Sequence, residues 1–174
     1  HSQIIRSLSD LCRKPQGPRD RQLLFGDGFT ILERNDDWCF GRATKDGYQG
    51  YINTADLARY TPATHWVSVL SSHAYAAPNL KSPDQMPLPF GAQVTVEAEH
   101  GDFFQTSAGF IPRQHLRATG NFLDDPLEVA KMFLGSPYLW GGNSAAGIDC
   151  SGLVQAACHA TRRACPGDSG PQQA

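Results

Sequence analysis

The residues of this sequence best suited to chemistry lie around Cys150. Asp149 is a good helix-capping residue and an apolar, helix-forming stretch follows it, so Cys150 is predicted to lie in the first turn of a helix. A thiol there lies at the positive end of the helix dipole, among backbone N–H groups that lack partners within the helix. These groups favour the thiolate and can stabilise the oxyanion formed when it attacks a carbonyl. Cys150 is therefore the candidate nucleophile of an acyl transfer; a buried cysteine on an amphipathic helix is the alternative.

Glycines and aromatic residues surround this cysteine. Tyr138 and Trp140 come just before Gly141 and Gly142, and the two aromatic side chains could wall a cleft. Gly152 falls in the first turn of the predicted helix, although glycine is a poor helix former. We therefore expect another part of the chain to pack closely against that turn.

The whole string PYLWGGNSAAGIDCSGLVQ resembles the active-site motif of NlpC-type bacterial cell-wall cysteine peptidases. The resemblance implies that Cys150 is the nucleophile. It also implies that Tyr138 and Trp140 line the substrate cleft, and that Asp149 and Ser151 contact the substrate on either side of the nucleophile.

A second, shorter similarity concerns the string CPGDSGPQ, which begins at Cys165. It looks like a peptide-binding segment of the same family, which implies substrate contacts for Asp168 and Ser169; an ordinary turn is the alternative.

The string GDSG within this segment is also similar to the nucleophile segment of trypsin-like serine proteases. We reject that interpretation because neither His73 nor His159 lies in the Ala-Ala-His-Cys context that those enzymes need.

A thiolate peptidase also needs a base, usually a histidine held by a third polar group. His159 is the one histidine after Cys150. Nine helical residues correspond to about 900° of rotation and a rise of about 13.5 Å, so His159 cannot reach the thiol. The resemblance implies a histidine several tens of residues after the cysteine. We therefore expect the catalytic domain to be incomplete and the chain alone to be inactive.

The elements that must position this motif begin with a repeat. Leu24–Ile31 and Pro89–Val96 share Phe, Gly and Thr at an offset of 65 residues. Further on, Gly50–Ile52 matches Gly109–Ile111 at an offset of 59 residues, so the second copy is six residues shorter. The first copy holds a turn there, Lys45–Gly47. Alternating apolar residues separated by Gly, Asp and Pro turns predict short strands in both copies.

Each copy is about the size of a small antiparallel β-barrel, and residues 8–118 resemble two bacterial SH3-like modules; two unrelated barrels formed by duplication are the alternative. The expected domains are residues 1–63, an SH3-like domain with an N-terminal arm, residues 64–118, a second one, and residues 122–174, a partial NlpC-type peptidase domain. The predicted fold class is α+β: two SH3-like β-barrels followed by the N-terminal part of a papain-like catalytic domain.

A helix is predicted to open the third domain. Asp125 can cap it, Pro126 suits its first turn, and Gly135 can end it. Its expected apolar face consists of Leu127, Ala130, Met132, Phe133 and Leu134.

This domain order is similar to that of the γ-D-glutamyl-L-diamino-acid endopeptidases of peptidoglycan recycling. The similarity implies that the first SH3-like unit recognises the free amino terminus of L-Ala-γ-D-Glu-diamino acid. An acidic residue would bind that ammonium group, and Asp27 is the candidate, with Tyr48 or Tyr51 beside it. The second copy has Ala92 in place of Asp27. Asp27 as a simple turn residue is the alternative.

Composition excludes several other classes of function. The net charge is −2, without the basic excess that nucleic-acid binding requires, and no apolar run has the length of a membrane span. The five cysteines form no CxxC pair, so we expect neither a zinc site nor a disulfide framework, and no metal or cofactor. The oligomeric state stays open.

These features predict a cysteine peptidase that hydrolyses the γ-D-Glu–diamino acid bond of peptidoglycan peptides through a thioester. The alternative is a non-catalytic peptidoglycan-binding protein with SH3-like domains. A recycling role would place the protein in the cytoplasm, which is our expectation, and a lytic role would require export.

Overall fold

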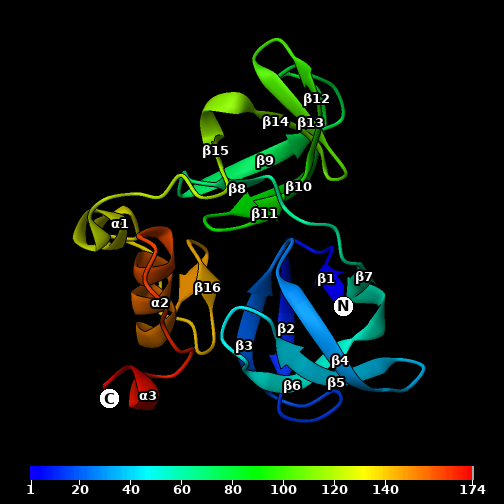
Figure 1. Cartoon of the computed structure of the whole chain (residues 1–174), viewed down its shortest axis with the longest axis vertical. Coiled ribbons are helices and arrows are strands. Elements are labelled where there is room, and N and C mark those ends of the chain that lie inside the picture. Colours follow the sequence, from blue (N-terminus) through cyan, green and yellow to red (C-terminus); the bar gives the residue numbers. More distant parts are fainter. Residues whose placement is uncertain (174) are drawn as a thin grey trace.

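The first part of the chain folds into a single antiparallel sheet. The structure is a computed structural model that describes residues 1–173. Seven strands cover residues 2–59, the first β unit: β1 (Ser2–Ile4), β2 (Leu8–Cys12), β3 (Arg19–Leu24), β4 (Gly28–Arg34), β5 (Trp38–Ala43), β6 (Gln49–Asn53) and β7 (Leu57–Arg59). Their order in the sheet is β3-β2-β6-β5-β4-β1-β7, so β3 lies at one edge (Figure 1).

Residues 65–118, the second β unit, form two smaller sheets. The strands are β8 (His65–Val67), β9 (Ser71–Tyr75), β10 (Asp84–Pro89), β11 (Gln93–Val94), β12 (Val96–His100), β13 (Phe103–Thr106), β14 (Gly109–Pro112) and β15 (Leu116–Ala118). One sheet has the order β10-β9-β14-β13-β12 and the other β11-β8-β15.

The sequence repeat is confirmed in the order of the elements. In the first unit β6 leads into a 3-10 turn, Thr54–Asp56, and then β7; in the second, β14 leads into Arg113–His115 and then β15. The six-residue difference lies in one hairpin, with three residues in the connection, two in β5 and one in β6. Residues 44–48 connect β5 to β6, whereas only residues 107–108 connect β13 to β14.

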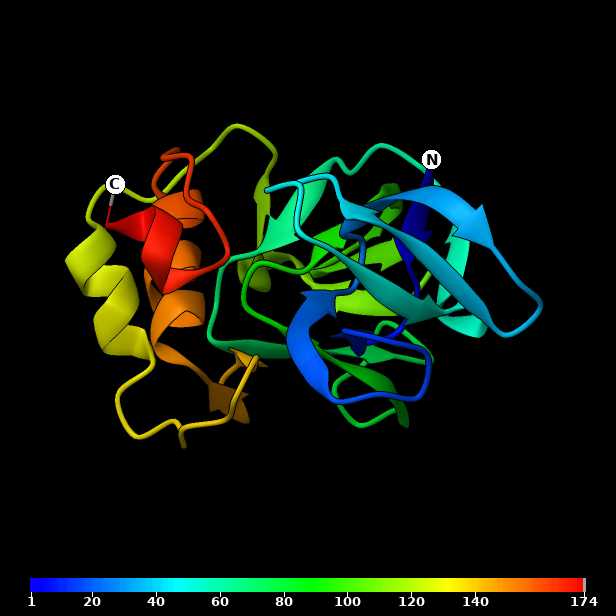
Figure 2. The same cartoon turned by 90° about the horizontal axis from the view of Figure 1, so that it is seen from below.

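Helices dominate the remaining part, residues 126–172, which we call the third segment. It contains α1 (Pro126–Met132), β16 (Asn143–Ser144), β17 (Gly147–Ile148), α2 (Cys150–Ala160) and α3 (Ser169–Gln172). The helices lie together at one side of the molecule, away from the N-terminus (Figure 2). None of the helices within residues 1–173 has the length and apolar character needed to cross a membrane.

Helix α1 begins as the sequence predicts, but its buried face differs. The Asp125 carboxylate accepts a hydrogen bond from the Leu127 N–H at 2.8 Å, which confirms the cap. Val129 and Phe133 are buried, whereas Leu127 and Leu134 are exposed. The predicted apolar face is therefore wrong at both leucines, because α1 ends at Met132 and only its Val129 side faces the core.

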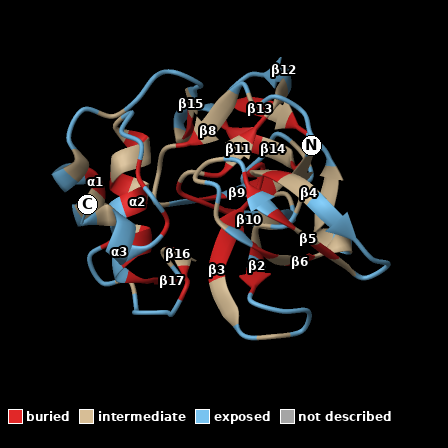
Figure 3. Cartoon of the chain, turned by 60° about the horizontal axis from the view of Figure 1, so that its bottom comes forward, coloured by how far each residue is buried: buried red, intermediate tan, exposed pale blue. Residues whose placement is uncertain are grey.

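The hydrophobic cores connect consecutive parts of the chain. Phe25 of the first unit is buried in the core of the second unit, with Val67 and Leu88. Phe90 of the second unit is buried in the core of the third segment, with Val129. Figure 3 shows buried positions in all three parts of the chain. Each Phe-Gly turn thus inserts its phenylalanine into the part that follows.

The architecture of residues 1–173 is mostly sheet with three short helices near the end, which agrees with the α+β class at this coarse level. Closure of the sheets into barrels and the predicted domain boundaries stay predictions.

Candidate functional site

Cys150 lies where the sequence places it, at the first residue of α2. It is the exposed cysteine among five free ones; Cys12, Cys39 and Cys165 are buried and Cys158 is half-buried. The thiol is therefore open to solvent at a helix N-terminus. It is not the buried structural cysteine of the alternative interpretation.

The Asp149 carboxylate organises the backbone around this thiol. Its Oδ1 accepts the Gly152 N–H at 2.6 Å and the Ser151 hydroxyl at 3.1 Å, and its Oδ2 accepts the Gly141 N–H at 3.0 Å. The predicted N-cap is confirmed. The side chains of Asp149 and Ser151 are both buried and bonded to each other, so their expected substrate contacts stay predictions.

The expected close packing of another part of the chain against Gly152 is confirmed. A Cβ on Gly152 would lie 2.6 Å from Asn143 Oδ1 and 2.7 Å from the Gly142 carbonyl oxygen. Residues 138–143, the motif loop, therefore pack directly against the first turn of α2. Any larger residue at 152 would push this loop away from Cys150.

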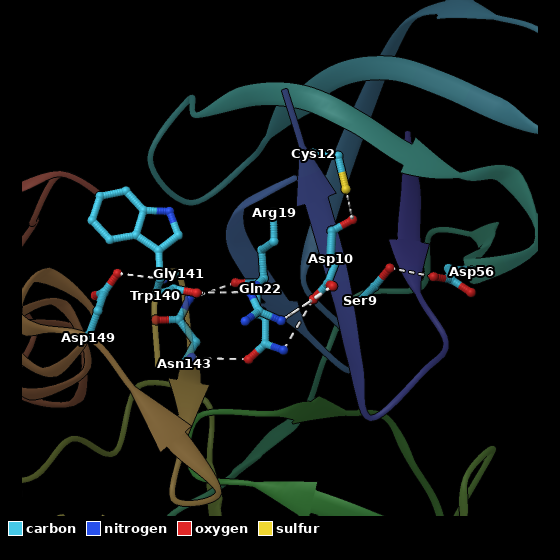
Figure 4. Close-up of polar contacts among 10 residues, drawn as sticks. All are labelled: Ser9, Asp10, Cys12, Arg19, Gln22, Asp56, Trp140, Gly141, Asn143 and Asp149. Carbon is cyan, nitrogen blue, oxygen red and sulfur yellow. Dashed lines mark hydrogen bonds and ion pairs between the residues drawn. The ribbon is translucent and has the colours of Figure 1, made fainter. Parts of the chain in front are cut away.

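The edge strand β3 holds the motif loop from the other side (Figure 4). The Gln22 N–H donates to the Gly141 carbonyl at 2.8 Å, and Asn143 Nδ2 donates to the Gln22 carbonyl at 2.6 Å. Arg19 Nε donates to the Trp140 carbonyl at 2.9 Å. Asp10 accepts hydrogen bonds from both Arg19 and Gln22. The first unit thus fixes the backbone that contacts Asp149.

Gly141 is required at this junction. Its φ is +68°, a conformation that favours glycine. A Cβ there would also lie 2.6 Å from the Asp20 carbonyl oxygen. Tyr138 and Trp140, on the same loop, are about two-thirds exposed, so both rings face solvent.

The segment after α2 lies against both α2 and the first unit. Gln172 Nε2 donates to the Ser151 carbonyl at 3.0 Å and to the Pro166 carbonyl at 2.8 Å. Asp168 and Ser169 are exposed at the start of α3. Their location near the first turn of α2 is compatible with the predicted peptide contacts.

Tyr48 and Tyr51 lie in different surroundings. Arg21 lies over the Tyr48 ring, with its guanidinium carbon 5.5 Å from the ring centroid. Burial, followed by the nearby carboxylates of Asp168 and Asp20, raises the pKa of Tyr48. Tyr51 instead packs against Phe40, with ring centroids 5.0 Å apart. Of the two tyrosines, Tyr48 is the one near the segment that carries Asp168.

Asp27 is buried and already has a cationic partner. Its Oδ2 accepts the Lys45 ammonium at 2.7 Å and the Leu24 N–H at 2.9 Å. It lines a cavity of about 230 Å³ that also contacts Gln155 and His159 of α2. Neither Cys150 nor the two tyrosines line this cavity in the part of the chain that the structure describes. A role for Asp27 in binding an ammonium group stays a prediction, and Lys45 occupies that position here.

The six histidines make their contacts away from Cys150. His159 Nε2 lies 3.2 Å from the Cys165 carbonyl oxygen, and His115 Nδ1 lies 2.9 Å from Ser72 Oγ. The remaining four contact residues of the two β units: His1 contacts Thr30 and Tyr60, His65 contacts Thr64 and Phe104, His73 contacts Tyr75, and His100 contacts Gln105 and Phe110. Within residues 1–173, none is hydrogen-bonded to the thiol.

His159 is expected to make the protein less stable in mild acid. Burial, and secondarily the Lys45 cation, lowers the pKa of His159 below its ordinary value of 6.5. The unfolded chain therefore binds the proton more readily than the folded chain does. The contribution of His159 to the free energy of unfolding is complete above about pH 6.5 and decreases as pH falls toward the pKa of the folded state. His159→Gln, which can still donate to the Cys165 carbonyl, should show a smaller fall in Tm between pH 7.5 and 5.5.

The matched control is His100→Gln, because His100 is exposed. Its Tm should follow wild type at both pH values. Equal losses of Tm in His159→Gln and wild type would contradict the assignment to His159.

Sequence reasoning missed most of the residues that connect the first unit to the site. Arg19, Arg21 and Gln22 of β3 are involved, as are Asp46 and Gln155. One signal pointed toward them: the extra residues of the first copy include Asp46. No local pattern indicates that the edge of β3 meets the motif loop.

Two family models match parts of the chain. Residues 135–174 match the NlpC/P60 family, and residues 11–57 match the SH3 domain of bacterial dipeptidyl-peptidases. The NlpC-type resemblance is therefore confirmed, and the SH3-like resemblance is confirmed for the first β unit. For the second β unit it stays a prediction.

Two curated relatives carry the name gamma-D-glutamyl-L-lysine dipeptidyl-peptidase. The protein from Bacillus subtilis is 25% identical over 169 residues, covering 87% of this chain and 56% of the relative. The protein from Bacillus cereus is 27% identical over 186 residues, covering 88% of this chain and 54% of the relative. The chain thus spans about half the length of these relatives.

The fold is similar to that of a solved NlpC/P60 family protein from Bacillus cereus. The TM-score is 0.83 at 18% identity, and the match covers 98% of this chain and 75% of the other. The arrangement of the two β units and the third segment is thus shared with that structure.

Proposed function

We propose that this chain carries the nucleophile and part of the substrate cleft of a cysteine peptidase that acts on peptidoglycan peptides. The observation that carries the proposal is the exposed Cys150 thiol at the start of α2, next to its Asp149 cap. The NlpC/P60 match and the names of the two relatives support it. The proposed scissile bond joins γ-D-Glu to a diamino acid in peptides with a free N-terminal L-Ala.

The proposed reaction is acyl transfer in two steps. Cys150 Sγ attacks the γ-carbonyl carbon of D-Glu, and a tetrahedral oxyanion forms near the free N–H groups of the first turn of α2. Its collapse breaks the C–N bond, leaves a thioester, and releases the amine of the diamino acid with a proton. Water then attacks the thioester, which releases the carboxylic acid and restores the thiol.

The substrate would lie along the exposed surface beside Cys150. We propose that Tyr138 and Trp140 wall this cleft, and that Asp168 and Ser169 contact the peptide. Tyr48 of the first unit is near enough to Asp168 for this carboxylate to contribute to the raised pKa of the tyrosine. We propose that Tyr48 helps to recognise the amino terminus of the substrate.

The thiol also needs a base, and none of the six histidines contacts it. We propose that the base and its polar partner lie outside the 174 residues, so that the chain alone does not turn over substrate. A recycling role on released muropeptides is also proposed, which would place the protein in the cytoplasm; export with a lytic role is the alternative.

The test uses the tripeptide L-Ala-γ-D-Glu-diaminopimelate. A longer protein that contains this sequence should release L-Ala-D-Glu and diaminopimelate, whereas the 174-residue chain should release neither, as followed by mass spectrometry. Acetylation of the L-Ala amino group should slow the reaction. Robust cleavage by the 174-residue chain would contradict its proposed inactivity. Peptidoglycan binding without cleavage by the longer protein would favour the non-catalytic alternative.

A further inference from the structure

The β5–β6 hairpin of the first unit is longer than its counterpart, and Asp46 in its connection is hydrogen-bonded to the third segment. Residues 44–48 connect β5 to β6, while the second unit has residues 107–108 at the same point. Lys45, Asp46 and Tyr48 of this hairpin all make interactions beyond the hairpin itself. The difference between the two copies is thus concentrated where the first copy meets the helix that carries Cys150.

Asp46 makes the most direct of these contacts. Its Oδ1 accepts the Tyr48 N–H at 3.0 Å, which fixes the carboxylate within its own turn. Its Oδ2 accepts Gln155 Nε2 at 2.8 Å. Gln155 lies on α2 and is only 3% exposed, and the same Nε2 donates to the Cys165 carbonyl at 3.0 Å. One buried amide therefore connects the hairpin, α2 and the segment that follows α2.

Arg21 adds a second connection at the same place. Arg21 is 2% exposed, its Nη1 donates to the Gly167 carbonyl, and its Nε has no hydrogen-bond partner within the described residues. The guanidinium lies over Tyr48, the last residue before β6. A Cβ on Gly167 would lie 3.0 Å from Asp46 Oδ2, so Asp46 and Arg21 approach the same point of the backbone.

We infer that Asp46 is a positioning residue that, through Gln155, fixes the segment Cys165–Ser169 relative to Cys150. This inference rests on the proposed function, because that function assigns Asp168 and Ser169 to the substrate. Asp46 itself touches neither the thiol nor these two side chains in the structure. It acts through Gln155 of α2, whose amide also donates to the Cys165 carbonyl at the start of that segment.

The reason lies in the cost of leaving buried polar groups without partners. With Asp46 replaced by alanine, Gln155 keeps only the Cys165 carbonyl as an acceptor for two N–H bonds. The amide must then turn toward water or leave one N–H unpaired, and either change weakens the contact with Cys165. The segment that follows α2 is thereby released on the side that faces the first unit.

Limited trypsin digestion of the 174-residue chain tests this directly. Arg162 and Arg163 are exposed just before the held segment, and Arg42 in β5 reports unfolding of the first unit. Asp46→Ala should raise the cleavage rate after Arg162 and Arg163 about tenfold, with cleavage after Arg42 unchanged. Asp46→Asn, which keeps one acceptor oxygen, should lie between Asp46→Ala and wild type. The matched control is Asp36→Ala, because Asp36 is exposed in the β4–β5 turn of the same unit; it should cleave as wild type.

Two results of the digestion would overturn the inference. The first is a wild-type rate for Asp46→Ala at Arg162 and Arg163. The second is an equal rise at these sites and at Arg42, because it would report unfolding of the whole unit rather than loss of a local contact.

The link to substrate is tested in a longer protein that cleaves the tripeptide. Asp46→Ala should raise KM about tenfold with a smaller change in kcat, and the alkylation rate of Cys150 should stay at its wild-type value. An unchanged KM would overturn the positioning role. If the wild-type longer protein cleaves no substrate, the proposed function fails, and the digestion of the 174-residue chain still decides whether Asp46 holds the segment.

Discussion

Replacing Cys150 by alanine should remove the fast-reacting thiol from this chain and abolish peptide hydrolysis by a longer protein that contains it. Cys150 is exposed at the first turn of α2, whereas Cys12, Cys39 and Cys165 are buried. Iodoacetamide should therefore label Cys150 at least about tenfold faster than the buried cysteines. The loss of hydrolysis should be at least about 10³-fold, because the nucleophile forms the covalent intermediate.

The other cysteines provide the comparison. Burial raises the pKa of Cys12, and burial together with the neighbouring Cys158 raises the pKa of Cys165 to about 11, so both thiols stay protonated at neutral pH. The matched control is Cys158→Ala, on the same helix as Cys150, which should leave the fast-labelling phase intact. Equal labelling rates for Cys150, Cys12 and Cys39 would argue against an activated thiol. In the longer protein, alkylation of the thiol should abolish peptide hydrolysis, whereas a serine-directed fluorophosphonate should leave it unchanged.

Phe90→Ala is expected to lower the free energy of unfolding by about 3–5 kcal/mol, the range for removal of a buried phenylalanine side chain. Phe90 is 3% exposed, and its ring packs edge-on against Trp66 at 5.6 Å and Phe133 at 5.7 Å between centroids. The third segment buries few large side chains of its own, so Phe90 supplies a large part of its core. Such a loss is a large fraction of a typical domain's stability.

The free energy of unfolding is measured by urea denaturation, with tryptophan fluorescence as the signal. Phe90→Leu keeps most of the volume and should cost less than about 1.5 kcal/mol. Leu134→Ala is the control in the third segment, because Leu134 is 81% exposed, and it should change stability by less than about 0.5 kcal/mol. A loss below about 1 kcal/mol in Phe90→Ala would mean that the third segment does not depend on this contact.

Local chemistry made a large part of the site predictable. The caps at Asp125 and Asp149 follow from short carboxylate side chains before helix-forming stretches, and both are present in the structure. The poor helix former Gly152 predicted a close neighbour, which is the motif loop. The caps depend on residues two or three positions apart, so their partners can be inferred from spacing alone. For Gly152 the sequence indicated a close neighbour without identifying it.

The location of the aromatic residues of the repeat was not predictable in the same way. Phe25 and Phe90 match each other in sequence, and such residues at a strand end are expected in the core of their own unit. In the structure each packs into the following part of the chain. Sequence periodicity shows which side chains must be buried, but it does not show which surface covers them.

The sequence by itself determined the candidate nucleophile, its helix and cap, and the duplicated β-rich part that precedes them. Only the tertiary structure decided that β3 holds the motif loop, that Asp27 pairs with Lys45, and that Asp46 reaches Gln155. The physical reason is the range of the interactions. A cap or a turn is a contact between neighbours along the chain, whereas Asp46 and Gln155 are 109 residues apart and meet only because the first unit and α2 pack together.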